Sequence, residues 1–365
     1  MFAREKPLPQ PVLSPDAPQN TFAEDIGGIL LGSTYWNPEI LPNGHIVAIG
    51  ASGSGKTQTL KAIAYELRHT YRQIQVILID FHGDQDIEGE TCFHLHMNSQ
   101  WGINLLVLNL DPEGGGPNLQ AIQVAALLKK TLQLGPNQEG LALDVLGECY
   151  HRRGILQSDV STWTREPPNF ADVQEVIADR IENGCKDSQK LQLKLVATFT
   201  YGIFNRAQPD LGEKLIRVDL SKLPPELAAI AAESLARQLM NNQRLQGEIE
   251  GKLPRTYLFI DEAKEMPKVS GSSCDRIIAD GRKYGLALVL ASQSERHLSL
   301  DVIGNSATKI VLPVDQTEVK KVARKFRFAE QKVAQLKPLT ALCRLGTQAT
   351  FAEILPYYQR IGDGT

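Results

Sequence analysis

Short runs of consecutive apolar residues recur along the chain and predict the buried strands of a parallel sheet. The first two runs, HIVAIG (45–50) and QVILID (75–80), are separated by a pattern with helical periodicity that begins at Lys56. A strand, a loop, a helix and a second strand over about 35 residues form a βαβ unit. Because the centres of both runs are wholly apolar, we expect a parallel sheet that is covered on both faces.

Similar runs return in the second half of the chain. Pro224 and Pro225 begin a helical pattern there, since proline is tolerated in the first turn of a helix. We also expect two short strands around FHLHM and GINLLVL, a single basic helix over 317–336 and a terminal hairpin. The later strand runs are LIRVDLSKL (215–223), RTYLFIDEA (255–263), GLALVLASQ (285–293) and TKIVLPV (308–314).

These elements predict an α/β fold with a mainly parallel central sheet, flanked by helices and interrupted by a helical insertion. Residues 1–24 contain five prolines and predict an extended arm or linker. Residues 25–116 and 207–365 are expected to form the two parts of the α/β core, and 117–206 the insertion. The candidate helices of the insertion are 118–133, 138–153, 170–182 and 188–204.

Composition narrows the function classes only slightly. The chain has 39 basic and 42 acidic residues, so its net charge of −3 argues against a protein coated with positive charge. It does not argue against a ring that concentrates basic groups in a pore. The five cysteines are scattered and predict neither a zinc site nor a disulfide framework, so we expect a reducing cytoplasm. No apolar run approaches the ~18 residues of a membrane span, and the N-terminus lacks a signal-peptide core.

The first strand run is followed by GASGSGKT, from Gly50 to Thr57, which fits the phosphate-binding pattern GxxxxGK[ST]. Such a loop surrounds phosphate oxygens with backbone N–H groups and needs glycine where side chains would obstruct it or φ is positive. We expect Lys56 to reach the β- and γ-phosphates of ATP and the Thr57 hydroxyl to bind Mg²⁺. The expected nucleotide-binding residues are Gly50, Ala51, Ser52, Gly53, Ser54, Gly55, Lys56, Thr57 and Gln58.

Two later strand runs end in polar residues suited to the same chemistry. RTYLFIDEA ends in Asp261, expected to hold Mg²⁺, and Glu262, expected to orient and deprotonate the attacking water. Gln293 follows the next run and is placed to sense the γ-phosphate, because ligands of open α/β sheets bind at this edge. In DFHGD, Asp80 is either a further acid of this face or a turn-forming residue.

The remaining candidates have weaker patterns. His94 and His96 alternate along a predicted strand without a third ligand, so we interpret them as ordinary strand residues. The basic run KKVARKFRFAEQK is interpreted as a solvated helix face rather than a nucleic-acid-facing one. Arg282, in DGRKYG, is either an arginine finger that reaches a neighbouring subunit's nucleotide or a solvated turn residue. The competing arginines are Arg255, Arg296, Arg324 and Arg327.

Taken together, these segments resemble the HerA–FtsK superfamily of RecA-like P-loop ATPases, the HerA branch in particular. GASGSGKTQTLKAI resembles its Walker A segment, VILIDFHGD its second-strand motif, and YLFIDEAKEM its Walker B strand. DGRKYGLALVLASQ resembles the stretch that ends in the sensor glutamine. The order and spacing agree over roughly residues 28–360.

The resemblance implies a hexameric ring that moves double-stranded DNA through its channel with ATP and Mg²⁺. By this resemblance Lys56, Thr57 and Asp261 bind phosphate and metal, and Glu262 is the base. Gln293 becomes the sensor and Arg282 the arginine finger. The chain departs from the family at Phe81, where proline is usual, and at Asp84, where glutamate is usual. HerA proteins also carry an N-terminal β-barrel domain, which we expect to be missing here or supplied by a partner.

Three functions remain open at this point. The main prediction is an ATP-dependent motor, a ring-forming double-stranded DNA translocase or helicase of HerA type that works with a partner nuclease. The first alternative is an ATPase of conjugation or secretion type that energises protein or DNA transfer at a membrane complex. The second is an ATP-gated switch that licenses a partner nuclease without translocation.

Overall fold

A nine-stranded sheet runs through the computed structural model, which describes residues 27–268 and 271–361; the predicted arm over 1–24 lies outside these residues. The strand order is β11-β10-β9-β3-β8-β7-β4-β6-β5. Neighbours from β9 to β5 are parallel, and the β10–β11 hairpin continues the sheet in antiparallel fashion. The strands are β3 (Ile46–Ile49), β4 (Gln75–Asp80), β5 (Thr91–His94), β6 (Leu215–Asp219), β7 (Thr256–Ile260), β8 (Leu286–Ser292), β9 (Thr308–Val311), β10 (Thr340–Leu345) and β11 (Gln348–Glu353).

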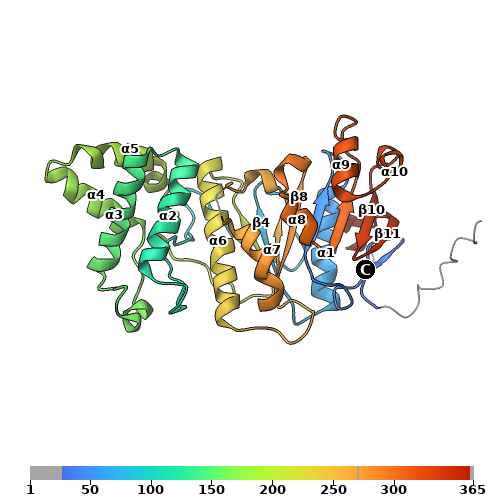
Figure 1. The fold of residues 1–365 in the computed structure, drawn as a ribbon, viewed down its shortest axis with the longest axis horizontal. Coiled ribbons are helices and arrows are strands. Elements are labelled where there is room, and N and C mark those ends of the chain that lie inside the picture. The colour runs from blue at the N-terminus through green and yellow to red at the C-terminus, as the bar shows by residue number, and fades with distance from the viewer. Residues whose placement is uncertain (1–26, 269–270, 362–365) are drawn as a thin grey trace, which may run out of the picture.

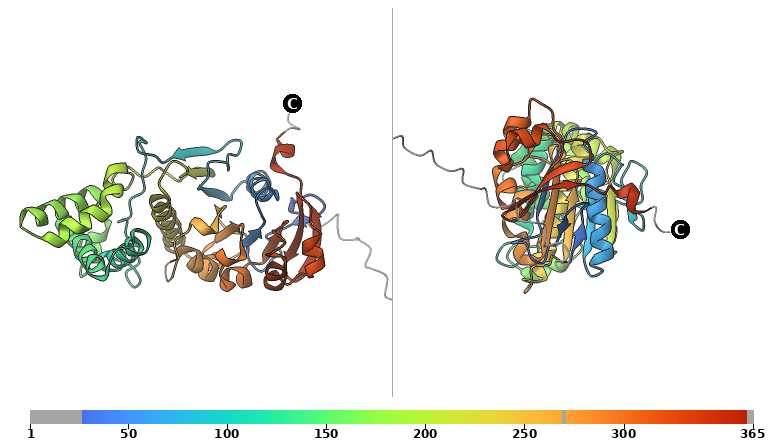
Figure 2. Two further views of the ribbon diagram at one scale, coloured as in Figure 1. Left: turned by 90° about the horizontal axis from the view of Figure 1, so that it is seen from above. Right: turned by 90° about the vertical axis from the view of Figure 1, so that its right-hand side faces the viewer.

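Helices cover both faces of this sheet, as the wholly apolar strands predict (Figures 1 and 2). Along β3, Ile46 and Ala48 belong to one hydrophobic core, whereas Val47 and Ile49 belong to the other, because successive side chains point to opposite faces. Helices α1 (Lys56–Thr70) and α11 (Tyr357–Arg360) cover the first face. The second is covered by α6 (Pro225–Leu245), α7 (Ser273–Tyr284) and α8 (Leu300–Asn305). The predicted α/β fold is confirmed.

Four helices lie at one end of the molecule, beyond α6 (Figure 1). They correspond to the four helices predicted between residues 117 and 206. Asn169 Oδ1 caps the start of α4 by accepting from the Ala171 N–H, and Asp172 accepts from the Asn169 N–H in return. Gly202 ends α5 in a left-handed conformation. The helices are α2 (Pro117–Leu132), α3 (Pro136–Arg152), α4 (Phe170–Glu182) and α5 (Lys186–Tyr201). Within the described residues, no helix is long and apolar enough to cross a membrane.

The strand predicted at GINLLVL is wrong. Residues 102–108 form no strand, although Leu105 and Leu106 are buried. Side chains take the place of a neighbouring strand here: the Leu106 N–H donates to Asn104 Oδ1 at 2.9 Å, and Gln120 Nε2 donates to the Leu105 carbonyl at 2.6 Å. An apolar run that is buried without a ladder has the same sequence pattern as a buried strand.

The single basic helix predicted over 317–336 is also wrong. It is divided into α9 (Val319–Phe326) and α10 (Glu330–Ala334). Arg327 between them has φ 59°, which is the left-handed region and ends α9. A short element completes the described part at the N-terminal side, where β1 (Ile29–Leu30) pairs with β2 (Tyr35–Trp36).

Candidate nucleotide and metal site

The predicted site residues follow strands that are neighbours in the sheet. Strands β3, β8, β7 and β4 lie side by side and are parallel, so their carboxyl ends meet at one edge. Gly50 follows β3, and its N–H donates to the carbonyl of Ser292, the last residue of β8, at 3.2 Å. Asp261 follows β7, and Asp80 ends β4. The edge therefore brings together segments that are more than 200 residues apart in the sequence.

The phosphate loop is held in shape by backbone contacts. Gly53 and Gly55 have φ of 76° and 96°, which glycine adopts without strain. The Ala51 N–H donates to the Pro313 carbonyl at 2.8 Å, and the Leu339 N–H donates to the Ser54 carbonyl at 3.1 Å. Helix α1 has no side-chain cap, so the N–H groups of its first turn are available to phosphate oxygens.

Leu339 was not among the predicted site residues, although it touches the loop. The φ of 96° favours glycine at position 55, and a Cβ atom there would also lie 2.6 Å from Leu339 Cδ2, so the Leu339 side chain would have to shift. Leu339 itself has φ 61°. An isolated leucine that follows Pro338 and precedes a hairpin carries no signal for this contact in the sequence.

Lys56 and Glu262 face each other across the edge. Lys56 Nζ lies 3.6 Å from Glu262 Oε2, and the two residues are only 9% and 3% exposed. The Ser292 hydroxyl, at the end of β8, donates to Glu262 Oε1 at 3.4 Å. The phosphate-loop lysine and the expected base thus occupy one buried site, and Ser292 adds a contact that the sequence did not predict.

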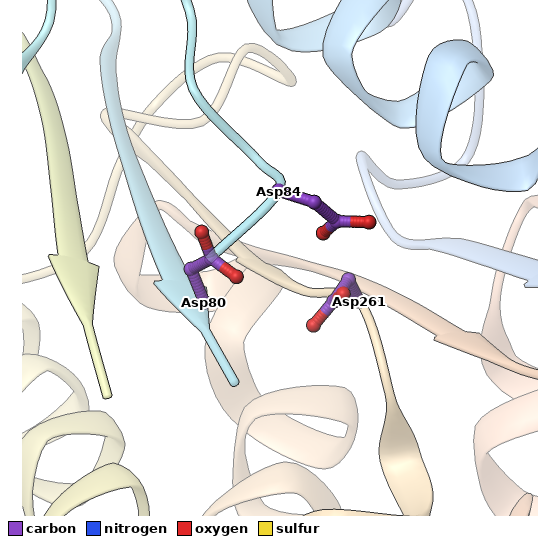
Figure 3. Close-up of side chains that lie close together, drawn as sticks. All are labelled: Asp80, Asp84 and Asp261. Carbon is purple, nitrogen blue, oxygen red and sulfur yellow. The ribbon is translucent and has the colours of Figure 1, made fainter. Parts of the chain in front are cut away.

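Asp261 is a buried carboxylate that the protein satisfies only in part. Gln85 Nε2 donates to its Oδ2 at 3.3 Å, while Oδ1 has no hydrogen-bond partner in the described part of the chain. Burial, and then the charge of Asp80, raise the pKa of Asp261 to about 7. Oxygens of Asp80, Asp84 and Asp261 lie within 4.8 Å of one another (Figure 3). Three carboxylates thus lie close together here, and an oxygen of Asp261 has no partner among the described residues, which suits a cation.

Asp80 has a different environment. Its carboxylate accepts N–H bonds from His82, Gly83 and Gln85 at 2.7–3.1 Å. Arg217 Nη1 adds a charged donor at 3.0 Å. Asp80 therefore shapes the DFHGD loop, which is the turn-forming interpretation of the two left open above. The loop then presents Gln85 to Asp261, a role for Gln85 that the sequence alone did not indicate.

The sequence and the fold of this chain are similar to those of known proteins. The family model for the type IV secretion-system coupling protein DNA-binding domain matches residues 217–335. The structure of VirB4 of Thermoanaerobacter pseudethanolicus superposes with a TM-score of 0.75 at 18% identity, covering 91% of this chain and 97% of that chain. The chain has the VirB4/TrwB-type fold. The predicted resemblance is confirmed.

The bacterial conjugative coupling protein TrwB also has this fold. Its structure without ligand gives a TM-score of 0.58 at 15% identity, covering 85% of this chain and 84% of that chain. The structure of TrwB in complex with ADP and Mg²⁺ gives a TM-score of 0.58 at 14% identity and covers 85% of this chain and 84% of that chain. No curated protein sequence matches the chain.

Other predicted residues occupy separate positions in this VirB4/TrwB-type fold. Gln293 is exposed just after β8, and Arg282 is exposed in the last turn of α7, directly before β8 begins. Arg282 therefore lies at the edge of the sheet opposite to Lys56 of the same chain. Thr57 is half-buried in the first turn of α1. His94 pairs with Asp219 at 2.8 Å, in keeping with an ordinary strand residue.

Proposed function

We propose that this chain is a Mg²⁺-dependent ATPase of conjugation or secretion type, which uses ATP hydrolysis to drive the transfer of DNA or protein. The observation that carries the proposal is the contact of Lys56 with Glu262 beside an uncapped helix start. The matched family model and the VirB4 and TrwB structures favour this alternative over the main prediction, a HerA-type DNA translocase.

The proposed roles follow from the contacts. Phosphate oxygens of ATP bind the N–H groups of the loop and the first turn of α1, and Lys56 neutralises the β- and γ-phosphates. When Lys56 contacts phosphate, Glu262 is released from its 3.6 Å contact and accepts a proton from the attacking water. The Ser292 hydroxyl retains the carboxylate from the other side. Gln293, exposed at the same edge, is proposed to contact the γ-phosphate.

The residues present also fit a magnesium ion. Mg²⁺ prefers oxygen ligands and retains several waters. Thr57 offers a hydroxyl and Asp261 a buried carboxylate oxygen without a partner among the described residues, with Asp84 exposed beside it. We assign the metal to Thr57 and Asp261, with Asp84 as an additional acid. Bound Mg²⁺ neutralises charge that develops on the phosphates during hydrolysis.

The location of Arg282 favours an assembly of several subunits. Arg282 lies at the opposite edge from its own phosphate loop, so if it contacts a nucleotide, that nucleotide belongs to a neighbouring subunit. We therefore propose a homo-oligomeric ring, with six subunits favoured, in which Arg282 acts in trans. The DNA-binding description of the matched family supports DNA as the substrate, with the double-stranded DNA motor and the ATP-gated switch as the competing functions.

Replacing the base tests this proposal. The variant Glu262→Gln is expected to bind a fluorescent ATP analogue normally but to release phosphate at least about 100-fold more slowly. Glu265→Gln, three residues later and half-buried, is the matched control and should retain the wild-type rate. Phosphate release should be measured for both variants with and without long double-stranded DNA, and particle mass should be measured with ATP. These measurements separate a DNA motor from a slow switch. Wild-type turnover in Glu262→Gln would show that the base is assigned wrongly.

A further inference from the structure

The β10–β11 hairpin ends the sheet at the opposite end of the molecule from α2–α5 (Figure 1). Among the described residues, the outer side of β11 is closed only at its C-terminal end. There the Ser33 N–H donates to the Glu353 carbonyl at 3.1 Å, and the Glu353 N–H donates to Ser33 Oγ at 3.0 Å. The backbone of Glu353 therefore faces outward. Since outward-facing residues alternate along a strand, Phe351 and Ala349 also present their N–H groups outward.

These two N–H groups have no partner in the part of the chain that the structure describes. Ala349 and Phe351 are exposed, and half of the Phe351 surface is accessible. An edge of this kind is a template for a further strand. Within the described part of the chain, the open stretch of the edge runs from Gln348 to Phe351, because Ser33 bonds to Glu353.

A groove of about 370 Å³ lies beside the open edge, between the hairpin and the segment around α10. Its apolar lining includes Phe328, Leu336, Leu342 and Phe351. Leu342 and Phe351 are paired across the hairpin and point to the same face, as does Ala349. A strand added to β11 would therefore direct every second side chain toward this groove.

Three cations lie next to residues that line the groove, without a salt-bridge partner among the described residues. Lys309 and Arg344 are directly paired across β9 and β10, an arrangement that like charges disfavour. Arg344 donates to the backbone carbonyl of Arg327 and stacks over the Phe328 ring at 5.0 Å, while its Nε has no partner in the described part of the chain. Burial, and then Arg344 and Arg327, lower the pKa of Lys309. No carboxylate forms a salt bridge with any of the three within residues 27–268 and 271–361.

We propose that this surface docks an extended, acidic segment of a partner protein by strand addition to β11. The backbone of the segment pairs with Ala349 and Phe351, an apolar side chain enters the groove, and a carboxylate compensates Arg344, Arg327 and Lys309. Nucleic acid would satisfy the cations but offers no strand for the open N–H groups and no aliphatic side chain for the groove. The inference is independent of ATP hydrolysis at the other site.

The sharpest test removes one outward N–H group. Ala349→Pro deletes a donor that the β10–β11 ladder does not use, so the hairpin should persist, whereas Ala349→Ser retains the donor. The probe is a fluorescein-labelled octapeptide, Glu-Asp-Val-Leu-Val-Thr-Asp-Glu, measured by anisotropy in the full chain. We expect Ala349→Pro to weaken binding about tenfold, Ala349→Ser to leave it unchanged, and melting temperature and ATP turnover to remain those of the wild type.

Two further variants keep the test decisive should Ala349→Pro not fold. Phe351→Ser is expected to weaken binding by about tenfold and Arg344→Gln by about fivefold, the latter only at low salt. Equal binding of a charge-reversed peptide, in which lysine replaces each acid, would overturn the proposal. So would displacement of the probe by a 20-base-pair DNA duplex, which would make this a nucleic-acid surface. If the wild-type protein is a dimer and the Ala349→Pro variant is a monomer, the edge pairs with a second copy of this chain. That result would overturn the proposal of a partner segment.

Discussion

Asp80 and Asp261 lie at the ends of the neighbouring strands β4 and β7, and both carboxylates are buried. Asp80 accepts three backbone N–H bonds and a charged bond from Arg217. From the described residues, Asp261 accepts one long bond, from Gln85, and its Oδ1 has no partner; its pKa rises to about 7. A carboxylate that the protein itself satisfies fixes a loop, whereas a carboxylate that it leaves unsatisfied is available to a ligand.

The largest expected effect is the loss of turnover in Asp261→Asn. If Asp261 holds the metal, phosphate release at saturating ATP should fall about 100-fold or more, since the lost charge stabilisation is on the order of 3 kcal/mol. Asp84→Asn, at the exposed acid beside it, is the control and should lose less than about tenfold. If phosphate release falls equally in the two variants, Asp261 is not distinguished from Asp84 as the metal ligand.

Asp80→Asn should affect stability instead. It leaves the buried Arg217 with Glu90 as its close partner, because Asp219 lies 3.9 Å away. The free energy of unfolding in urea is expected to fall by about 3 kcal/mol. Asp187→Asn removes a pair with Lys190 that is about two-thirds exposed on both sides, and should cost less than about 0.5 kcal/mol. An unchanged midpoint in Asp80→Asn would show that the loop does not depend on this carboxylate.

The pH dependence of the metal-free protein provides an independent test of Asp261. Asp80 and Asp84 face Asp261 and raise its pKa, while His82 and Lys56 oppose them. Because the folded pKa, about 7, exceeds the ordinary value of 3.8, the native state binds more protons than the unfolded state between these values. Stability should therefore fall as pH rises from about 4 to 7.

Asp261→Asn should flatten this part of the stability profile. Melting temperature in the presence of EDTA, recorded against pH for both proteins, measures the effect. Parallel profiles for wild type and variant would contradict the raised pKa of Asp261.

The smallest expected effect concerns Ser292, which contacts the expected base rather than the metal. Its bond to Glu262 Oε1 is long, 3.4 Å, and its hydroxyl also lies 3.0 Å from the Ser294 carbonyl and 3.3 Å from His297 Nδ1. Ser292→Ala should lower kcat about fivefold, near 1 kcal/mol, and leave KM unchanged. A change in KM alone would show that Ser292 acts on nucleotide binding instead.

Much of this arrangement could be predicted from the sequence. The strand runs at 45–50, 75–80 and 285–293 each contain a strand, because a continuous apolar run bounded by polar residues suits only a buried position. Gly53 and Gly55 adopt the positive φ that the loop pattern predicts. Signals of this kind are local: each depends on a residue type and its immediate neighbours.

Other features depend on contacts between distant segments. Leu339 reaches the phosphate loop from nearly 300 residues away in the sequence, and Arg217 reaches Asp80 from another strand. The run GINLLVL is apolar like a strand, but Asn104 and Gln120 take over its backbone bonds. Composition and residue spacing do not show which distant segments contact each other.

The sequence by itself determined where most of the strands lie, where glycine is needed and which acids follow the strands, because these depend on local sterics and burial. Only the tertiary structure decided that β8 separates the phosphate loop from β7. It also decided that Asp80 is saturated, whereas an oxygen of Asp261 and the outward N–H groups of β11 have no partner among the described residues. The physical reason is that the availability of a donor, acceptor or charge is set by what the rest of the fold places within hydrogen-bonding distance.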